Sequence, residues 1–576
     1  EIHNLGSVDL VNVAFFDDFG AQNAQIVSID SVAVAPIAYV AADPMRQIFT
    51  ATTLDDDFMT DAGPSETEFT GGVASLAPGD SISFEVTVDF TTVTDLEDFV
   101  LTNSAIASGF GFYPGRPVND DTKVSDQSGA TIQENGDTVV ELSVLEVQKS
   151  LVRVQPSPRI DGDTSWFTFQ IKLSNPGPSP VASLSLLEDL EARLGGLYEA
   201  GGFSQIIVPP FVMDLVPLAT NLVLNGEFDG TAAEPEILLP GSTLAAETSV
   251  VIEFVAEVDH DNPMIPQPAV NFVVGTAFPD QDQNGEADPG SLPLLAVSDN
   301  MFDGLDTDES IDADLITNND PTPLPMLQTF KGLTVPFATV GMSGQTNRFS
   351  GEFEFVISNP GAMPLYNLQV RDLFLDQPAI QFIESATVQP FTSDRNGSLF
   401  DGATVDDAFI VDAVASPTLN NGMAPVLAVG ETIEFSAEIV FVARATAVLA
   451  ELLNQIEVQA AVDVNADGNP GNDDASRIVD RSDNIGTLLV DDPNDPGLDV
   501  GDDPTPALIA RIGSAKSFVP DEATGLLPRA SSVGDGFYEF VTQVVLENTG
   551  EIPLVDIVLS DSDPAAWGTT VVVERQ

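Results

Sequence analysis

Residues 352–372 read EFEFVISNPGAMPLYNLQVRD, and this pattern decides the fold. Before Asn359, apolar residues alternate with polar ones, so that Phe353, Phe355 and Ile357 share one face. After it, a second alternation runs to the acidic residue Asp372. A period of two with one polar face is typical of antiparallel or sandwich strands. Because Asn and Gly tolerate turn conformations, the Asn-Pro-Gly tripeptide is predicted to turn the chain from one strand into the next.

The Asn-x-Gly tripeptide recurs four times, which predicts a tandem array of one domain type. Each copy is followed 13 positions later by an acidic residue. The copies begin at Asn4, Asn175, Asn359 and Asn548, and the acids are Asp17, Glu188, Asp372 and Asp561. We expect an all-β protein of tandem immunoglobulin-like antiparallel β-sandwich domains with long acidic loops. The predicted segments are a partial first repeat (1–140), a second (141–323), a third (324–506) and a partial fourth (507–576).

Composition narrows the class of partner. The 576 residues include 90 acidic and 19 basic residues, a formal net charge of −71, which argues against nucleic acid and anionic membranes. There is no cysteine, so disulfides do not stabilise the fold. No apolar run reaches the ~18 residues that a membrane span needs. The partial repeats at both ends indicate a mature or partial segment of a longer protein.

Three of the five lysines open a repeat, namely Lys149, Lys331 and Lys516. This regularity has two explanations. The lysine is a structural residue of the first strand that pairs with an acid at a domain junction, or it forms an isopeptide cross-link to Asn or Asp.

A second repeated block is a turn followed by a half-buried strand, as in 427–439.

These motifs together resemble a known family. The opening Lys-Ser/Gly, the Asn-x-Gly turn, the acid after the next strand, the Pro-Gly strand start and the closing Asn319–Pro323 are similar to the immunoglobulin-like conserved repeats of large bacterial and archaeal cell-surface proteins. The resemblance implies an extracellular array of β-sandwiches. The chain departs from the family pattern because Asp372 is followed by Leu373-Phe374 instead of Leu-Pro, and because the repeat is long. The sequence therefore leaves open whether each repeat contains extra strands or a second subdomain.

Two loops at the same place in the repeat match the calcium-loop pattern D-x-[DN]-x-[DN]-G, at 280–285 and 463–468. Alternate oxygen side chains can converge on a hard cation, and the sixth-position Gly permits the sharp turn. The bidentate Glu of an EF-hand is absent, because position twelve holds Asp474 in one loop and Ser291 in the other. Two alternatives are solvated turns and an acidic coat adapted to high salt. The expected Ca²⁺ ligands are Asp280, Asp282, Asn284, Asp288, Asp463, Asn465, Asp467 and Asp474.

We expect no catalytic residues, and no cofactor other than Ca²⁺, so the protein is predicted not to be an enzyme. The two histidines are far apart, and His260, in the sequence DHDNP, is predicted to lie in a polar turn. The predicted function is a structural repeat protein of an extracellular filament, stalk or surface layer, stiffened by calcium. Its expected partners are neighbouring copies of itself or other surface proteins. The alternatives are an adhesin that binds glycan or protein, and non-catalytic spacer repeats of an extracellular enzyme.

Overall fold

The computed structural model describes most of the chain, and the elements below are grouped by the predicted repeats. The described residues are 1–17, 19–54, 67–92, 100–112, 114, 123–127, 138–158, 164–194, 203–213, 220–260, 269–281, 283–300, 321–340, 347–374, 377–396, 426–444, 452–465, 476–484, 504–519, 531–534, 537–539 and 542–559.

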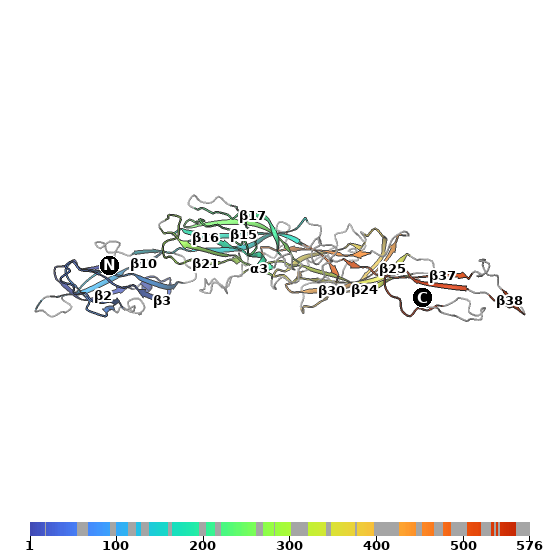
Figure 1. Ribbon diagram of the computed structural model, residues 1–576, viewed down its shortest axis with the longest axis horizontal. Coiled ribbons are helices and arrows are strands. Elements are labelled where there is room, and N and C mark those ends of the chain that lie inside the picture. The colour runs from blue at the N-terminus through green and yellow to red at the C-terminus, as the bar shows by residue number, and fades with distance from the viewer. Residues whose placement is uncertain are drawn as a thin grey trace.

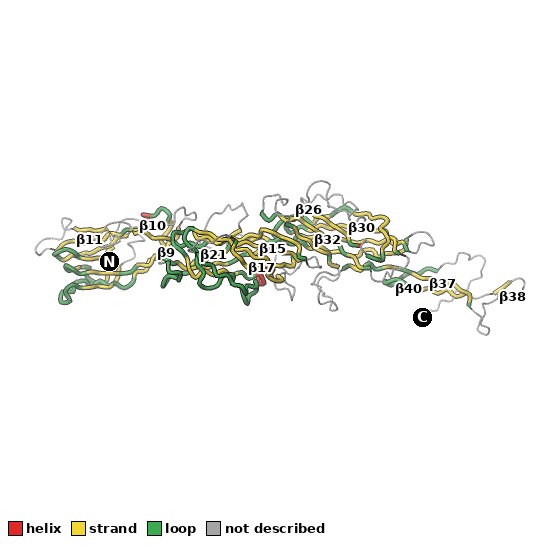
Figure 2. The backbone as a smooth tube through the Cα atoms, turned by 90° about the horizontal axis from the view of Figure 1, so that it is seen from above, coloured by secondary structure: helices red, strands yellow, loops and turns green. Residues whose placement is uncertain are grey.

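The chain is elongated and built of β-sheets that follow one another from the N-terminal to the C-terminal end (Figure 1), and the view from above shows the same succession (Figure 2). The sheets are antiparallel apart from a few short parallel contacts, and the described helices, α1 (Phe19–Gln22) and α3 (Leu190–Leu194), are a turn long. This confirms the predicted all-β class with antiparallel β-sandwich layers. The domain boundaries themselves stay a prediction.

The second repeat packs a five-stranded sheet against a three-stranded one. The sheet orders are β17-β18-β15-β14-β22 and β16-β20-β21, and β19 pairs with β23. The strands are β14 (Glu146–Pro156), β15 (Thr164–Asn175), β16 (Val181–Leu187), β17 (Phe203–Val212), β18 (Thr248–Asp259), β19 (Val270–Asn271), β20 (Val274–Pro279), β21 (Leu294–Val297), β22 (Asp299–Asn300) and β23 (Thr322–Pro323).

The third repeat reproduces this arrangement. Its larger sheet has the order β27-β30-β25-β24-β34, with β28 on β30 and β36 on β24; the smaller sheet is β29-β26-β32-β33, and β31 pairs with β35. The strands are β24 (Gln328–Thr339), β25 (Arg348–Ser358), β26 (Leu365–Asp372), β27 (Ile380–Val388), β28 (Thr392–Ser393), β29 (Val426–Leu427), β30 (Thr432–Ala443), β31 (Leu453–Asn454), β32 (Ile456–Val462), β33 (Arg477–Arg481), β34 (Asp483–Asn484), β35 (Thr505–Pro506) and β36 (Ile509–Ala510).

The predicted alternation coincides with burial in these two repeats. In β25 every second residue is buried, and Phe353, Phe355 and Ile357 are fully buried. Phe355 stacks on Phe435 of β30 with ring centroids 4.8 Å apart. The aromatic faces of the large sheet therefore fill the interior between the two layers.

The first repeat has smaller sheets and a core of its own. Its sheets are β12-β11-β2-β6-β5 with β7 on β2, β1-β8-β4, β3-β9 and β10-β13. A cluster around Phe49, Phe69 and Leu76 forms its core. The strands are β1 (Ile2–His3), β2 (Asp9–Asp17), β3 (Ile26–Val34), β4 (Ala38–Val40), β5 (Thr53–Leu54), β6 (Thr67–Thr70), β7 (Ser75–Leu76), β8 (Ser81–Ser83), β9 (Val86–Thr92), β10 (Val100–Asn103), β11 (Ala105–Phe112), β12 (Lys123–Gln127) and β13 (Thr138–Glu141).

The fourth repeat differs from the expectation of a one-sided strand. Its sheets are β37 (Ile512–Phe518) with β40 (Thr542–Asn548), and β38 (Ser531–Gly534) with β39 (Phe537–Glu539). The apolar residues Val544 and Leu546 are exposed. The predicted alternation is present in the sequence, but within the described residues no second layer covers this two-stranded sheet, so the alternation does not coincide with burial.

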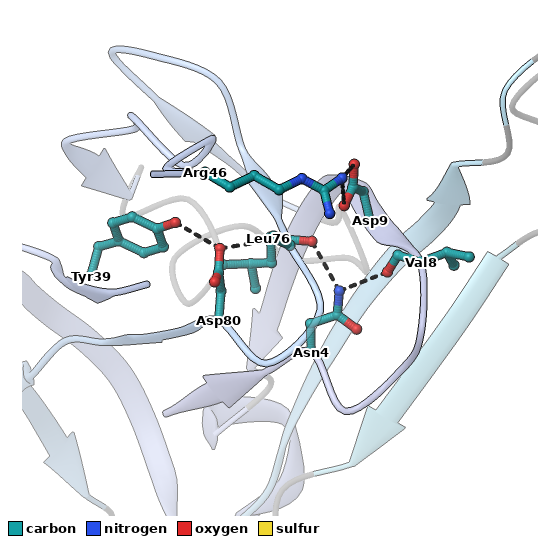
Figure 3. A network of polar contacts seen from close by, with 8 residues as sticks. Asn4, Val8, Asp9, Tyr39, Arg46, Leu76 and Asp80 are labelled. Atoms are coloured by element: carbon teal, nitrogen blue, oxygen red, sulfur yellow. Dashed lines mark hydrogen bonds and ion pairs between the residues drawn. The ribbon is translucent and has the colours of Figure 1, made fainter. Parts of the chain in front are cut away.

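The Asn-x-Gly tripeptide forms the same turn in all four repeats, as predicted. The Asn side-chain oxygen accepts a hydrogen bond from the Gly amide at 2.9–3.1 Å, which is an Asx turn. In the first repeat the Asn4 amide also donates to the carbonyls of Val8 and Leu76, both at 2.9 Å (Figure 3). The asparagine thus ties its own turn to the strand start of the second repeated block.

Replacing Asn359 with Ala is expected to destabilise the third repeat by about 2–4 kcal/mol, because it leaves three buried backbone groups without a partner. The side-chain amide of Asn359 donates to Met363 O (2.9 Å) and Leu427 O (3.0 Å), and the side-chain oxygen accepts a hydrogen bond from Gly361 N. Denaturant unfolding of the full chain measures the loss. The matched control is Asn548→Ala, at the same repeat position but exposed, which should cost less than about 1 kcal/mol. Equal losses in the two variants would contradict this account.

A second repeated feature was not visible in the sequence. Eight residues after each turn asparagine lies a residue in the left-handed region, with φ of 51–53°. In the first three repeats the pairing register shifts at this point, as it does at a β-bulge. The four residues are Asn12, Ser183, Asn367 and Asp556. The residue type is not constant (Asn, Ser, Asn and Asp), so only the backbone shows that the conformation recurs.

Candidate functional site: two buried lysine–carboxylate pairs

The lysine that opens the second repeat is fully buried inside the sandwich. Lys149 lies on β14 and its ammonium forms an ion pair with Glu188, whose side chain is also inaccessible to solvent. The Lys149 nitrogen lies over the ring of Phe169, 4.6 Å from its centroid. Burial lowers the pKa of Lys149 and raises the pKa of Glu188. Each pKa shift disfavours the charged form of its group, so the buried environment favours a neutral amine and a neutral carboxyl.

The third repeat holds the same constellation. Lys331 on β24 lies 2.8 Å from Asp372 at the end of β26, and both side chains are fully buried. The Lys331 nitrogen lies 4.2 Å from the ring centroid of Phe353 and 5.0 Å from that of Phe355. Burial lowers the pKa of Lys331 to about 8. The cation and the aromatic faces attract each other, which offsets part of the desolvation cost.

These pairs join the two layers of each sandwich. β14 and β24 belong to the larger sheets, whereas Glu188 follows β16 and Asp372 ends β26 in the smaller sheets. The prediction that the repeat-opening lysine pairs with an acid is therefore confirmed for Lys149 and Lys331, but the predicted place of the pair was wrong. The partner is the acid that follows the Asn-x-Gly turn, and the pair lies in the domain core instead of at a junction.

A buried asparagine completes each constellation. Asn271 on β19 and Asn454 on β31 are 0% and 1% exposed, and neither the amide nitrogen nor the oxygen of either residue makes a well-formed hydrogen bond. Asn271 nevertheless lies close enough to Glu188 to contribute to lowering the pKa of that carboxyl. Buried amides normally have hydrogen-bond partners, so a repeated exception needs an explanation.

The first repeat contains the acid and the asparagine of this constellation. The Asn103 amide donates to Asp17 at 3.1 Å, and Asn103 ends β10 as Asn271 ends β19 and Asn454 ends β31. Asp17 and Asn103 thus pair directly with each other.

The first predicted calcium loop is described in part. Asp280 is buried, and its two carboxylate oxygens accept the amides of Asn284 and Gly285, both at 3.0 Å. The side-chain oxygen of Asn284 accepts a hydrogen bond from the backbone N–H of Glu286, and the Asp288 carboxylate accepts one from the backbone N–H of Gln281. Gly285 adopts a left-handed φ of 82°, as the pattern requires. Asp282 lies outside the described residues.

The second predicted calcium loop is described only at its start. Asp463 is 4% exposed and Asn465 is half-buried, while Asp467 and Asp474 lie outside the described residues. Among the residues that the structure describes, no three acidic or histidine side chains gather in a metal-binding cluster. The calcium ligands stay a prediction, and the described part of the first loop is a turn held by its own carboxylates.

His260 is where the expectation was wrong. The sequence predicted a polar turn, but His260 is fully buried at the end of β18. The backbones of Leu327 and of Val479, both in the third repeat, lie against the ring, and burial lowers the pKa of His260 to about 3. A residue of the second repeat is therefore enclosed by the third, which marks the junction between them.

The junction is apolar and hydrogen-bonded. One continuous cluster of buried side chains runs from Leu145 in the second repeat to Ile509 beyond the third. Across the boundary, Leu324 N donates to Ala269 O at 2.9 Å, and inside the third repeat Ala362 N donates to Leu324 O at 2.9 Å. A methyl group at Gly361 would lie 2.5 Å from Met326 N, so the turn glycine permits this close approach of the incoming chain.

Comparison with known proteins yields similarity in structure alone. No family model matches the chain, and no curated protein sequence is significantly similar to it. Among solved structures, the full-length major pilin SpaD from Corynebacterium diphtheriae is 9% identical over 81% of this chain and 90% of that chain, with a TM-score of 0.24. At these values the likeness assigns neither a family nor a function.

Two further structures are similar at the same low level. The C-terminal domain of the AgI/II polypeptide BspA from Streptococcus agalactiae is 8% identical over 55% of this chain and 96% of that chain (TM-score 0.21). The CupB6 tip adhesin from Pseudomonas aeruginosa is 10% identical over 57% and 97% (TM-score 0.16). In the described part of the chain, no helix has the length and hydrophobicity to cross a membrane.

Proposed function

We propose that this protein is a structural component of an extracellular filament, stalk or surface layer, in which stacked β-sandwiches form a stiff rod. The observation that carries the proposal is the continuous apolar core through the second and third repeats. Repeats joined by flexible linkers would have separate cores, and their relative orientation would be free. The elongated succession of sheets (Figure 1) and the net charge of −71, which keeps the surface well solvated, support the same role.

The location is tested by digesting intact cells that make this protein with an added protease. A surface component should disappear from the intact cells while a cytosolic marker is spared. Retention of the protein until the cells are lysed would contradict an extracellular role.

The proposal includes calcium bound by the two Asp/Asn loops. The repeated pattern and the left-handed Gly285 support it. Extracellular calcium modules bind at ~0.1–1 mM, so calcium at ten to a hundred times the dissociation constant would add roughly 1.4–2.7 kcal/mol per site.

Thermal unfolding of the full chain in calcium, compared with chelator at matched ionic strength, should therefore show a rise of several degrees. The rise should shrink in the double variant Asp463→Ala, Asp467→Ala, which removes two ligands of one loop. Magnesium at the same ionic strength is the control for general charge screening. No response to calcium, combined with stabilisation by molar sodium chloride, would favour the high-salt explanation of the acidic residues.

A further inference from the structure

The unexplained feature of the two middle repeats is a buried amide beside a buried lysine–carboxylate pair. Lys149, Glu188 and Asn271 are all 0% exposed, as is Lys331, and Asp372 and Asn454 are 2% and 1% exposed. If the ion pair served stability alone, an asparagine buried next to it would be expected to have hydrogen-bond partners. A lysine, a carboxylate and an asparagine at equivalent places in the fold occur with the same orphaned amide in both repeats.

Backbone pairing brings the asparagine to the lysine. Asn271 on β19 is the direct partner of Thr322 on β23, and the Thr322 hydroxyl donates to the carbonyl of Lys149 at 3.0 Å. The third repeat repeats this connection. Asn454 is the partner of Thr505, whose hydroxyl donates to the carbonyl of Lys331 at 2.7 Å. Thr322 and Thr505 thus connect the asparagine strand to the lysine strand in their repeats.

The surroundings favour reaction between an amine and an amide. A lysine attacks a carboxamide only as the neutral amine, and the apolar shell disfavours its charge. Burial raises the pKa of Glu188, so this carboxyl can hold a proton beside the amine. The rings of Phe169, Phe353 and Phe355 exclude water, which would otherwise compete as a nucleophile.

We propose that each of the two middle repeats is closed by an isopeptide bond, between Lys149 and Asn271 in the second and between Lys331 and Asn454 in the third. The lysine Nζ attacks the asparagine Cγ, and a new C–N bond forms. Glu188 or Asp372 accepts the proton released by the attacking nitrogen and delivers a proton to the amide nitrogen, which leaves as ammonia when the old C–N bond breaks. The carboxyl group is regenerated, and no oxidant or co-reactant is needed.

The bond would tie the strand that opens each sandwich to a strand near its end. Segments 149–271 and 331–454 would then be closed loops that cannot be pulled out from the chain ends. This inference is independent of where the protein is located, because it rests on the core alone.

The test is the intact mass of the full chain, purified and measured under denaturing conditions. Two bonds predict a mass below that of the sequence by about 34 Da, because each bond releases one ammonia of about 17 Da. Peptide mapping should show Lys149 joined to Asn271 and Lys331 joined to Asn454, with no tryptic cleavage after either lysine. A mass equal to that of the sequence overturns the proposal. A single joined pair confirms the bond in that repeat and overturns it in the other.

Ammonia can also be lost when an Asn-Gly sequence forms a succinimide, so the joined peptides decide the result. A mass deficit that maps to an asparagine followed by Gly overturns the proposal; these are Asn135, Asn225, Asn284, Asn396 and Asn421. Asp372→Asn keeps the shape of the side chain but removes the proton shuttle, and it should abolish the Lys331–Asn454 bond while leaving the Lys149–Asn271 bond. The matched control is Asn103→Ala in the first repeat, which should leave both bonds in place. Retention of the Lys331–Asn454 bond in Asp372→Asn would overturn the role of the carboxyl.

Discussion

Lys331→Met is expected to destabilise the third repeat by about 3–5 kcal/mol, because it leaves a buried carboxylate without its partner. The Lys331 nitrogen is the donor that faces Asp372 at 2.8 Å, whether it is an ammonium or the N–H of the proposed isopeptide bond. Asp372 also accepts the amide of Phe374, but a single neutral donor cannot replace a charge-assisted bond in a fully buried site. Against a total of about 5–15 kcal/mol for a domain, this loss is large.

Hydrogen–deuterium exchange of the β24 and β25 amides in the full chain measures this loss locally. A loss of about 3–5 kcal/mol corresponds to exchange that is roughly two to four orders of magnitude faster. Lys516→Met is the matched control, since Lys516 opens the fourth repeat but is exposed, and it should change protection by less than about 0.5 kcal/mol. Unchanged exchange in Lys331→Met would show that the buried pair contributes nothing to the core.

His260→Leu is expected to make the junction between the second and third repeats less sensitive to acid. The pKa of His260 is about 3 in the folded chain and 6.5 in its ordinary state, so the unfolded chain binds more protons between these values. The stability that neutral His260 contributes is therefore complete above pH 6.5 and is lost as the pH falls towards 3. At pH 4.5 the wild-type chain should have lost roughly 2–3 kcal/mol through this group, whereas the leucine variant loses none of it.

Unfolding free energies of the two chains at pH 7.5 and pH 4.5 give the comparison. Many carboxylates titrate in the same range, so the informative quantity is the difference between wild type and variant, which cancels their contribution. Parallel pH profiles for the wild type and His260→Leu would contradict the burial of a neutral imidazole at this junction.

The sequence was sufficient to predict the strands and the turns but not the contacts between layers. Alternation placed Phe353 and Phe355 on one face, and the Asn-x-Gly turns have the predicted form in every repeat. Both members of the Lys331–Asp372 pair stood out as regular features of the repeat. They are 41 residues apart and lie on different sheets, so only the packing of one layer on the other shows that they meet.

The contacts at the junction between the second and third repeats could not be predicted from the sequence for a related reason. The hydrophobic periodicity of a strand indicates which of its residues face the interior of their own domain. It does not indicate which surface residues the next domain buries. The sequence around His260 has the composition of a solvated turn, yet the third repeat encloses this residue. The orphaned amides of Asn271 and Asn454 could not be predicted from the sequence, because an unmet hydrogen bond is a property of the assembled core.

The most direct test of the account is the distribution of distances between one label in the second repeat and one in the third. The chain has no cysteine, so pairs of exposed residues can be replaced by Cys and spin-labelled without side reactions. Val208 and Phe382, which are 37% and 45% exposed, report across the junction, and Val208 with Leu295 reports within the second repeat as the reference. A stiff rod predicts that the distribution across the junction is nearly as narrow as the reference, whereas a broad or multimodal distribution would contradict it.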